Sequence, residues 1–419
     1  MVTILHVVIW SAIASCTLSA QRILFVLDGT NGTYASAQAA VDAAMDGDIV
    51  NILSLTPGNV TIANKSIWLV GRSKDVAISN LSIRDPSPRV ALRISRLRFG
   101  RISELSVESK ALASTTLSSV VFEDCDFETL LAFSEAYRIQ TPSSIVTFQN
   151  CTFTGLGSGW NFIDPAPLMS IQNSKLVVFN SCTVKGSTGW GSGGQSPGRG
   201  GPGGLAIDVN ASTVLLQNSS VIGGKGGLYL YYGYNYIYGP GGPAIEATGG
   251  SRIIATKVGA QQEIQVGFGS SSQHAVALLD STFEHSAVQV GKIKAEGSSR
   301  VISPTIPHLA LALVSPFNLG ALAWFTVGGE PQRACVVVVS HGWNPIDFPF
   351  GTFFPDGRGW FHSVSAVLDA NGRAAILTAV GRDPVSLGQV LTCQAVEISP
   401  TLELRLSTPL AGIVSVPPF

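Results

Sequence analysis

A short pattern of apolar and polar positions returns along most of the chain: apolar, two polar, small or apolar, polar, apolar. Its copies cover residues 122–127, 148–153, 179–184, 216–221, 279–283, 78–83 and 94–99. The small position is cysteine in the first three copies, serine in the next two and leucine in the last two. Between residues 78 and 216, consecutive copies begin 16 to 37 residues apart. A constant strand-like pattern joined by connections of variable length predicts a β-solenoid.

The start of the chain carries a family resemblance. Residues 34–44 read as a short amphipathic helix, Asp46-Gly47-Asp48 follows, and strand-like runs come at 60–62 and 67–71. This segment resembles the N-terminal cap and first coils of right-handed parallel β-helix proteins of the pectin-lyase-like superfamily. Such a cap covers strand edges and core side chains that an open solenoid end would expose. The resemblance implies an all-β fold in which a right-handed parallel β-helix with an N-terminal capping helix occupies residues 21–303.

The pattern changes at residue 304. Six strand-like runs separated by Pro and Gly follow, and Asn371-Gly372 lies in a short segment suited to a hairpin turn. Regular short strands of this kind predict a small β-sandwich over residues 304–419. The region resembles C-terminal modules of exported planctomycete-type bacterial proteins.

The first twenty residues read as an export signal. An apolar run covers 7–14, and Leu18-Ser19-Ala20 is suited to cleavage before Gln21, which predicts a signal peptide over 1–20. Alternatively, residues 13–16 resemble a bacterial lipobox, in which case Cys16 becomes a lipidated N-terminus. Either interpretation predicts a secreted or cell-surface protein. After signal removal we expect no transmembrane span, because no later stretch is long and apolar enough.

Charge and cysteine content narrow the functional classes. The net charge is −1 and only 13% of residues are charged, so no overall field attracts nucleic acid. Cys125, Cys151 and Cys182 share one column of the repeat and are expected to stack inward as small buried residues, with a disulfide between coils as the alternative. Cys335 and Cys393 lie in strand-like C-terminal runs and form a disulfide candidate, since export permits disulfides.

Two Gly-rich insertions, at 186–204 and 223–250, interrupt the repeats. The second holds six of the eight tyrosines: Tyr229, Tyr231, Tyr232, Tyr234, Tyr236 and Tyr238. If residues 232–238 form one extended strand, alternation places the last four on one face, where rings can stack on sugars. Trp160 and Trp190 could extend that platform. A loop that packs on itself and a protein contact remain as alternatives.

A basic stretch is the second candidate for binding. Alternation suggests that Arg96 and Arg98 point outward, and guanidinium groups suit the carboxylates or sulfates of an acidic glycan. The alternative is a solvated face whose arginines pair with Glu104 and Glu108 on neighbouring coils.

Many pectin-lyase-like proteins are polysaccharide lyases or glycoside hydrolases, so the resemblance raises the question of catalysis. A calcium-dependent lyase needs carboxylates for the metal and a basic residue, and Asp124, Asp126 and Arg98 are the nearest match. The alternative is that both aspartates are solvated rim carboxylates. The motifs typical of hydrolases with this fold are absent from the sequence.

These patterns predict an exported, non-catalytic, cell-surface or extracellular protein that contacts polysaccharide or another surface component and needs no cofactor or metal. One alternative is a polysaccharide lyase of the pectate-lyase type, with calcium as cofactor. A second is a structural protein that associates with itself through the Gly/Tyr-rich segments. The oligomeric state stays open.

Overall fold

The computed structural model describes most of the chain. The residues it leaves undescribed are 1–21, 28–33, 54–57, 88–90, 111–117, 130–136, 158–164, 192–199, 232–234, 257–262, 270–273, 287, 304–308, 314–316, 319–320, 342, 349–350, 356–360, 381–389, 400–403, 408–409 and 416–419. The predicted signal peptide, with Cys16, therefore lies outside the described residues. Within them, no helix is long and apolar enough to cross a membrane.

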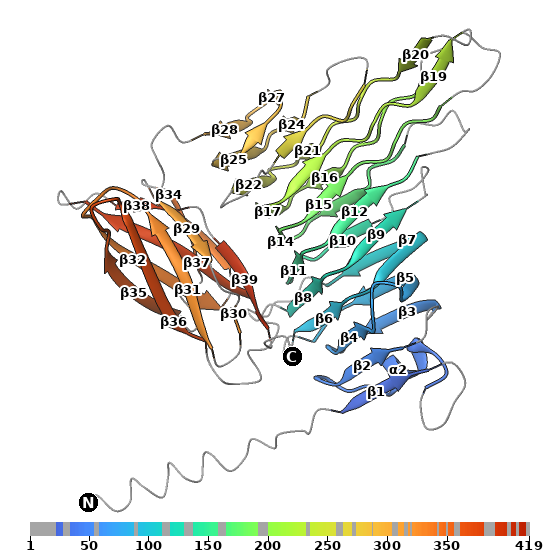
Figure 1. The fold of residues 1–419 in the computed structure, drawn as a ribbon, viewed down its shortest axis with the longest axis horizontal. Helices are drawn as coiled ribbons and strands as arrows, with labels where there is room; N and C mark the ends of the chain where they lie inside the picture. The colour runs from blue at the N-terminus through green and yellow to red at the C-terminus, as the bar shows by residue number, and fades with distance from the viewer. Residues whose placement is uncertain are drawn as a thin grey trace, which may run out of the picture.

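The predicted parallel β-helix is confirmed (Figure 1). One long sheet, sheet A, has eleven strands, and every neighbouring pair in it is parallel. In spatial order they are β1 (Ile23–Val26), β2 (Ile49–Ile52), β4 (Trp68–Gly71), β6 (Leu92–Ser95), β8 (Ser118–Glu123), β11 (Ser144–Gln149), β14 (Leu176–Asn180), β17 (Thr213–Gln217), β22 (Arg252–Thr256), β25 (Thr282–Ser286) and β28 (Arg300–Ile302).

The second sheet, sheet B, is also parallel and divides into two arms. The first arm is β9 (Asp126–Thr129), β12 (Thr152–Gly155), β15 (Thr183–Lys185), β18 (Ser220–Ile222), β23 (Glu263–Gln265) and β26 (Gln289–Val290). The second arm is β10 (Tyr137–Gln140), β13 (Met169–Gln172), β16 (Ile207–Asn210), β21 (Ile245–Thr248), β24 (Val276–Leu279) and β27 (Ile293–Glu296). The arms meet at β7 (Arg98–Glu108), which continues through β5 (Ala77–Arg84) to β3 (Gly58–Ala63). Each coil therefore runs from sheet A to the first arm, then to the second arm, and back.

Alternation of side chains fills the interior of the coils. Inward residues are apolar and stack on their equivalents one coil away, as parallel strands in register require. The rings of Phe99 and Phe127 stack with centroids 4.5 Å apart, and Phe127 and Phe153 continue the column at 4.4 Å. These rings are fully buried. The repeated apolar ends of the sequence pattern are thus the solenoid core.

The corner between sheet A and the first arm explains the cysteine column. In five of these turns one residue has a positive φ, between 47° and 54°. These residues are Arg96, Asp124, Asn150, Ser181 and Asn218. The next residue points inward, and its side chain lies near two carbonyl oxygens. The Cys151 Sγ lies 3.3 Å from the Gln149 oxygen and 3.6 Å from the Phe122 oxygen. Burial raises the pKa of the Cys125 and Cys151 thiols well above their ordinary value. The three cysteines are buried and free, as predicted, and the alternative of a disulfide between coils is wrong.

A second ladder of turns lies where the second arm returns to sheet A. Here serine takes the inward position, at Ser174, Ser212, Ser251 and Ser281. The Ser174 N–H donates to the Ser212 Oγ at 2.9 Å, so successive coils are joined through these hydroxyls. The sequence repeat at 279–283 belongs to this corner, and the copy at 78–83 lies within the single strand β5. The sequence pattern therefore aligned residues from two different corners of the coil. At both corners a small side chain that can donate a hydrogen bond follows a residue with a positive φ.

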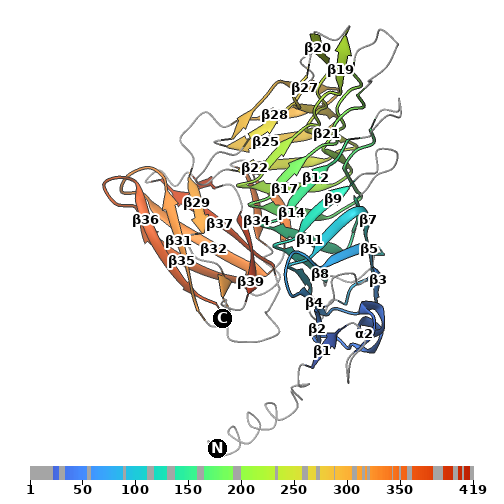
Figure 2. The same ribbon diagram turned by 45° about the vertical axis from the view of Figure 1, so that its right-hand side comes forward.

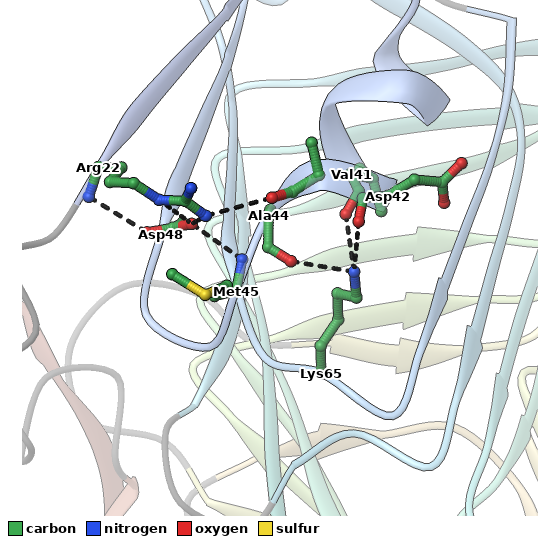
Figure 3. Close-up of polar contacts among 8 residues, drawn as sticks. Arg22, Val41, Asp42, Ala44, Met45, Asp48 and Lys65 are labelled. Carbon is green, nitrogen blue, oxygen red and sulfur yellow. Dashed lines mark hydrogen bonds and ion pairs between the residues drawn. The ribbon is translucent and has the colours of Figure 1, made fainter.

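Asp48, the last residue of the Asp-Gly-Asp run, holds together the chain around the capping helix (Figure 3). The buried Asp48 carboxylate accepts from the Met45 N–H at 2.8 Å and from the Arg22 Nε at 3.0 Å. Burial alone would raise the pKa of Asp48, but hydrogen bonds from Arg22 and Met45 outweigh it and lower that pKa. Gly47 has a φ of +87°, a value that favours glycine.

The predicted capping helix is α2 (Ala37–Ala43), and both of its ends are capped. The Ser36 hydroxyl accepts from the Ala39 N–H at 3.1 Å at the N-terminus. At the C-terminus, the Lys65 ammonium donates to the carbonyl oxygens of Val41, Asp42 and Ala44 at 2.9, 3.2 and 3.0 Å (Figure 3). A lysine at this position supplies donors to carbonyls at the end of the helix, where backbone partners run out.

The C-terminal region forms two main sheets of its own. The three-stranded sheet is β29 (Ala310–Leu313), β31 (Leu322–Gly328) and β36 (Arg373–Ala379). The six-stranded sheet is β30 (Phe317–Asn318), β39 (Leu410–Ser415), β37 (Val390–Ile398), β32 (Ala334–His341), β35 (Phe361–Val367) and β38 (Leu404–Leu406). A separate pair is formed by β33 (Trp343–Phe348) and β34 (Gly351–Pro355). Side chains of both main sheets share one core, in which Phe325 from β31 is grouped with Val337 from β32.

The disulfide candidate in this region is wrong. Cys335 and Cys393 are both free and buried. On the paired strands β32 and β37, Cys335 lies opposite Glu397 and Cys393 lies opposite Val339. The two cysteines are thus four residues out of register, about 13 Å along the strands, which is too far for a disulfide. Sequence alone placed both in strands but could not supply the register.

Part of the outer face of sheet A is apolar and buried. Its side chains form a separate cluster on β11, β14, β17 and β22: Ile145, Leu176, Val178, Leu215 and Ile254. Strand β39 of the C-terminal region lies against β14, and both views place that region beside sheet A (Figures 1 and 2). The C-terminal region thus covers this face, and sheet B is left to face solvent.

Candidate functional site

Variation in coil length concentrates at the corner between the two arms of sheet B. The connection from β26 to β27 is two residues long, whereas those from β15 to β16 and from β18 to β21 contain the Gly-rich stretches. Five segments lie side by side here: 186–191, 200–204, 223–228, 239–243 and 267–269. We call them the Gly-rich arm. The two insertions predicted from sequence are therefore extensions of one corner in successive coils.

Hydrogen bonds within the Gly-rich arm repeat every third residue. The N–H groups of Gly224 and Gly227 donate to the carbonyls of Gly204 and Gly201, each at 2.8 Å. The N–H groups of Gly239 and Gly242 donate in the same way to Gly227 and Gly224, each at 2.8 Å. A three-residue period with bonds only to neighbouring segments is the geometry of polyproline II helices, which have three residues per turn and no internal bonds. The arm thus has the hydrogen-bond spacing expected of packed polyproline II segments.

Close backbone packing explains the glycine content of the arm. A Cβ added to Gly200 would lie 1.8 Å from the Gly227 oxygen, and one added to Gly241 would lie 1.7 Å from the Gly267 oxygen. Neither residue has a positive φ, so the requirement is space and not backbone freedom. Neighbouring backbones touch where side chains would otherwise stand, which makes the arm a close-packed scaffold.

The tyrosine-rich segment extends the Gly-rich arm as a hairpin. Strand β19 (Leu228–Tyr231) pairs with β20 (Asn235–Tyr238) in antiparallel register, with Leu228 opposite Tyr238 and Tyr231 opposite Asn235 (Figure 1). The single extended strand predicted for 232–238 is therefore wrong, because the six tyrosines are shared between two strands and the stretch that connects them. Tyr232 and Tyr234 lie outside the described residues. The structure describes the backbone of Tyr229, Tyr231 and Tyr236, but not their side chains.

The two predicted tryptophans do not form a described platform with these tyrosines. Trp160 lies outside the described residues. Trp190 is half-buried, and its ring occupies the place where a Cβ on Gly201 would stand, 2.1 Å from Nε1. Its ring therefore packs against the backbone of the Gly-rich arm.

An aromatic and cationic cluster stands on the arm. The rings of Tyr238 and Phe268 meet edge to face with centroids 4.9 Å apart. The Lys225 Nζ lies 4.7 Å from the Tyr238 centroid and 5.6 Å from the Phe268 centroid. Phe268 is 65% exposed, and Lys225 is also exposed. We call these three residues the Lys225 cluster.

Backbone bonds hold the members of the Lys225 cluster together. The Gly226 N–H donates to the Phe268 carbonyl at 2.8 Å, which ties the residue after Lys225 to the ring-bearing residue of the next coil. The Gly189 N–H donates to the Lys225 carbonyl at 2.7 Å, and the Gly239 N–H, next to Tyr238, donates to Gly227 at 2.8 Å. An exposed ring fixed in this way offers an apolar face for a sugar ring, and the ammonium offers a charge beside it.

The predicted lyase residues pair with charges on the solenoid surface. Arg98 donates to Glu128 at 2.6 Å, and Lys74 pairs with Asp126 at 3.1 Å. Asp124 occupies the turn between β8 and β9, with a φ of 53°. Within the described part of the chain, no three His, Cys, Asp or Glu side chains gather as a group able to hold a metal ion.

The basic stretch is divided between two faces. Arg93 belongs to sheet A, where it pairs with Glu123 and lies 4.5 Å from the centroid of the Trp68 ring. Arg98 belongs to sheet B, and Arg96 is an exposed turn residue with a φ of 53°. The partner of Arg98 is Glu128, one coil further on.

One carboxyl on the second arm of sheet B has a shifted pKa. Glu246 on β21 lies opposite Asp208 on β16, so two carboxyl groups occupy neighbouring outward positions. Partial burial and the nearby Asp208 charge raise the pKa of Glu246, while Lys294 opposes the shift.

Two members of the Lys225 cluster were missed by sequence reasoning. Lys225 is a lone charge within glycines, and Phe268 lies 30 residues after Tyr238 outside the tyrosine-rich segment. Only the stacking of successive coils brings them together. The available signal was their position: both lie in a Gly-x-Gly context at the same corner of consecutive coils.

Comparison with known proteins shows similarity in structure but not in sequence. No protein-family model matches the chain, and no curated protein matches its sequence. Among solved structures, the chain is similar to the A-module of the mannuronan C-5 epimerase AlgE6 from Azotobacter vinelandii, with 13% sequence identity and a TM-score of 0.27 over 64% of this chain and 94% of that chain.

Proposed function

We propose that the protein is an exported, non-catalytic surface protein that contacts polysaccharide through its Gly-rich arm. One observation carries the proposal: Phe268 presents a 65% exposed ring that is held edge-on by Tyr238 at 4.9 Å. An exposed ring held by a neighbouring ring suits the flat apolar face of a sugar, because the contact reduces the rotamer freedom that sugar binding would cost.

The ion pairs on sheet B support the non-catalytic part of the proposal. Arg98 is the base of the lyase alternative, and it donates to Glu128 at 2.6 Å. Asp126, one of the two proposed calcium ligands, pairs with Lys74 at 3.1 Å. Both groups would have to leave these partners before they could act on a substrate.

Affinity electrophoresis of the purified protein in gels that contain different polysaccharides tests the proposal. We expect retardation by at least one polysaccharide and about tenfold weaker binding for Phe268→Ala, since loss of a central aromatic contact costs more than 1 kcal/mol. Phe268→Tyr keeps the ring and should bind nearly as well as the wild type.

Leu279→Ala is the matched control, because Leu279 is a 47% exposed apolar residue on β24 that is not part of the arm. Equal retardation of wild type and Phe268→Ala would contradict the proposal. Release of unsaturated or shortened sugar during the same incubation would contradict the non-catalytic part.

A further inference from the structure

The Lys225 ammonium is the only charge in the Lys225 cluster. It lies over two rings, at 4.7 Å from the Tyr238 centroid and 5.6 Å from that of Phe268, and it forms no ion pair with any carboxylate of the described residues. Rings satisfy one face of an ammonium and leave its remaining N–H donors free for a ligand.

The sequence around the cluster carries no negative charge. The Gly-rich stretches 186–204, 223–245 and 265–275 contain Arg199 and Lys225 and no Asp or Glu. An anionic ligand that approaches this end of the Gly-rich arm would therefore meet no carboxylate from these stretches. On the solenoid surface, by contrast, Arg98 pairs with Glu128 and Lys74 pairs with Asp126.

We propose that the Lys225 cluster selects anionic polysaccharides, with the ammonium of Lys225 binding a carboxylate or sulfate while the Phe268 and Tyr238 rings contact the sugar that bears it. This inference rests on the proposed function and adds the charge class of the ligand. The geometry favours it because a cation and an exposed ring lie 5.6 Å apart, close enough for one charged sugar to contact both.

Preorganisation gives the selection its strength. The Gly226 N–H donates to the Phe268 carbonyl at 2.8 Å, which fixes the segment that bears the lysine against the segment that bears the ring. The ligand therefore does not have to order either backbone, and the ion pair forms in a position that the fold has already set.

Three dextrans with one backbone test the inference: unmodified dextran, carboxymethyl-dextran and dextran sulfate. Binding of the full chain is measured at low and high ionic strength. We expect both charged dextrans, or one of them, to bind at least about tenfold more tightly than dextran at low salt, and salt to remove the preference. Comparison of the two charged forms distinguishes carboxylate from sulfate.

Three variants locate the charge. Lys225→Met keeps the aliphatic stem and should lose the preference for charged dextran, whereas Lys225→Arg should keep it. Lys110→Met removes the same charge from an 83% exposed lysine of the solenoid and should bind as the wild type does. Thermal melts of each variant should coincide with the wild type, because the Lys225 side chain makes only cation–π contacts among the described residues.

The outcomes separate this inference from the proposed function. If Lys225→Met keeps the preference for a charged dextran, or if the wild type shows none, the inference is wrong, while the effect of Phe268→Ala on polysaccharide binding still decides the proposed function. If Phe268→Ala leaves the binding of every polysaccharide unchanged, the proposed function fails, and this inference fails with it.

Discussion

Cys182 and Ser219 occupy equivalent positions in consecutive coils, and the Cys182 N–H donates to the Ser219 hydroxyl at 3.0 Å. Each side chain lies close to the carbonyl oxygen two residues before it, 3.3 Å away for Cys182 and 2.8 Å for Ser219. Each also lies close to a carbonyl of the preceding coil, Phe148 or Phe179. The thiol and the hydroxyl therefore perform the same task, which is to satisfy buried turn carbonyls.

Cys182→Ser should accordingly change the stability of the fold by less than about 1 kcal/mol, because the hydroxyl is a better donor in the same place. Cys182→Val keeps the volume but removes the donor, and it should cost about 1–3 kcal/mol. Midpoints of urea unfolding measure both effects. A valine variant as stable as the serine variant would show that the column is held by packing alone.

This column also shows how far the sequence could predict the fold. The cysteine repeat correctly indicated parallel coils with small inward residues, since apolar periodicity is a local property. It could not separate the two corners, because both place a small donor after a residue with positive φ. Asp124 and Asp280 have nearly the same φ, 53° and 52°, although they lie at different corners.

Asp48→Asn should lower the free energy of unfolding at pH 7 by about 1–2 kcal/mol. This loss is smaller than for a fully buried ion pair, because Arg22 is partly exposed and solvent screens its charge. Since the folded-state pKa of Asp48 is lowered, its stabilisation is present above the unfolded-state pKa, about 3.9, and is lost as the pH falls through the lower folded-state value. The difference between wild type and variant should therefore shrink below about pH 4. Thermal melts from pH 7 to pH 3 follow it, with Asp75→Asn, an exposed aspartate of the same unit, as control. A difference that is constant with pH would exclude the ionised pair as its source.

Gly227→Ala should disturb the Gly-rich arm. The added Cβ would lie 1.8 Å from the Trp190 carbonyl oxygen, so the two segments must separate. We expect the free energy of unfolding to fall by about 1–3 kcal/mol and hydrogen exchange at the amides of 223–242 to become faster. Gly100→Ala is the control, because its Cβ would meet nothing nearer than the Ala77 Cβ at 4.0 Å. Equal exchange rates in the two variants would show that the arm is not close-packed in solution.

The same arm marks the limit of sequence reasoning about the site. The glycine and tyrosine content drew attention to residues 223–250, but alternation was applied to a segment that forms a hairpin. The Lys225 cluster depends on which glycine segments become neighbours. That arrangement follows from backbone packing across coils, and the shared Gly-x-Gly context of Lys225 and Phe268 does not by itself say which segments become neighbours.

The outer face of sheet A gives the last prediction. Leu176, Val178 and Leu215 point away from the solenoid core, yet each is fully buried. With β39 lying against β14, a chain that ends at residue 303 would expose these side chains as one apolar patch on a regular sheet. We expect such a fragment to bind the dye ANS and to self-associate in analytical ultracentrifugation, and expect replacement of the three residues by threonine to reverse both effects. Threonine retains strand propensity, so the substitutions should not disturb the sheet itself. A monomeric 22–303 fragment without dye binding would show that the C-terminal region does not bury this face in solution.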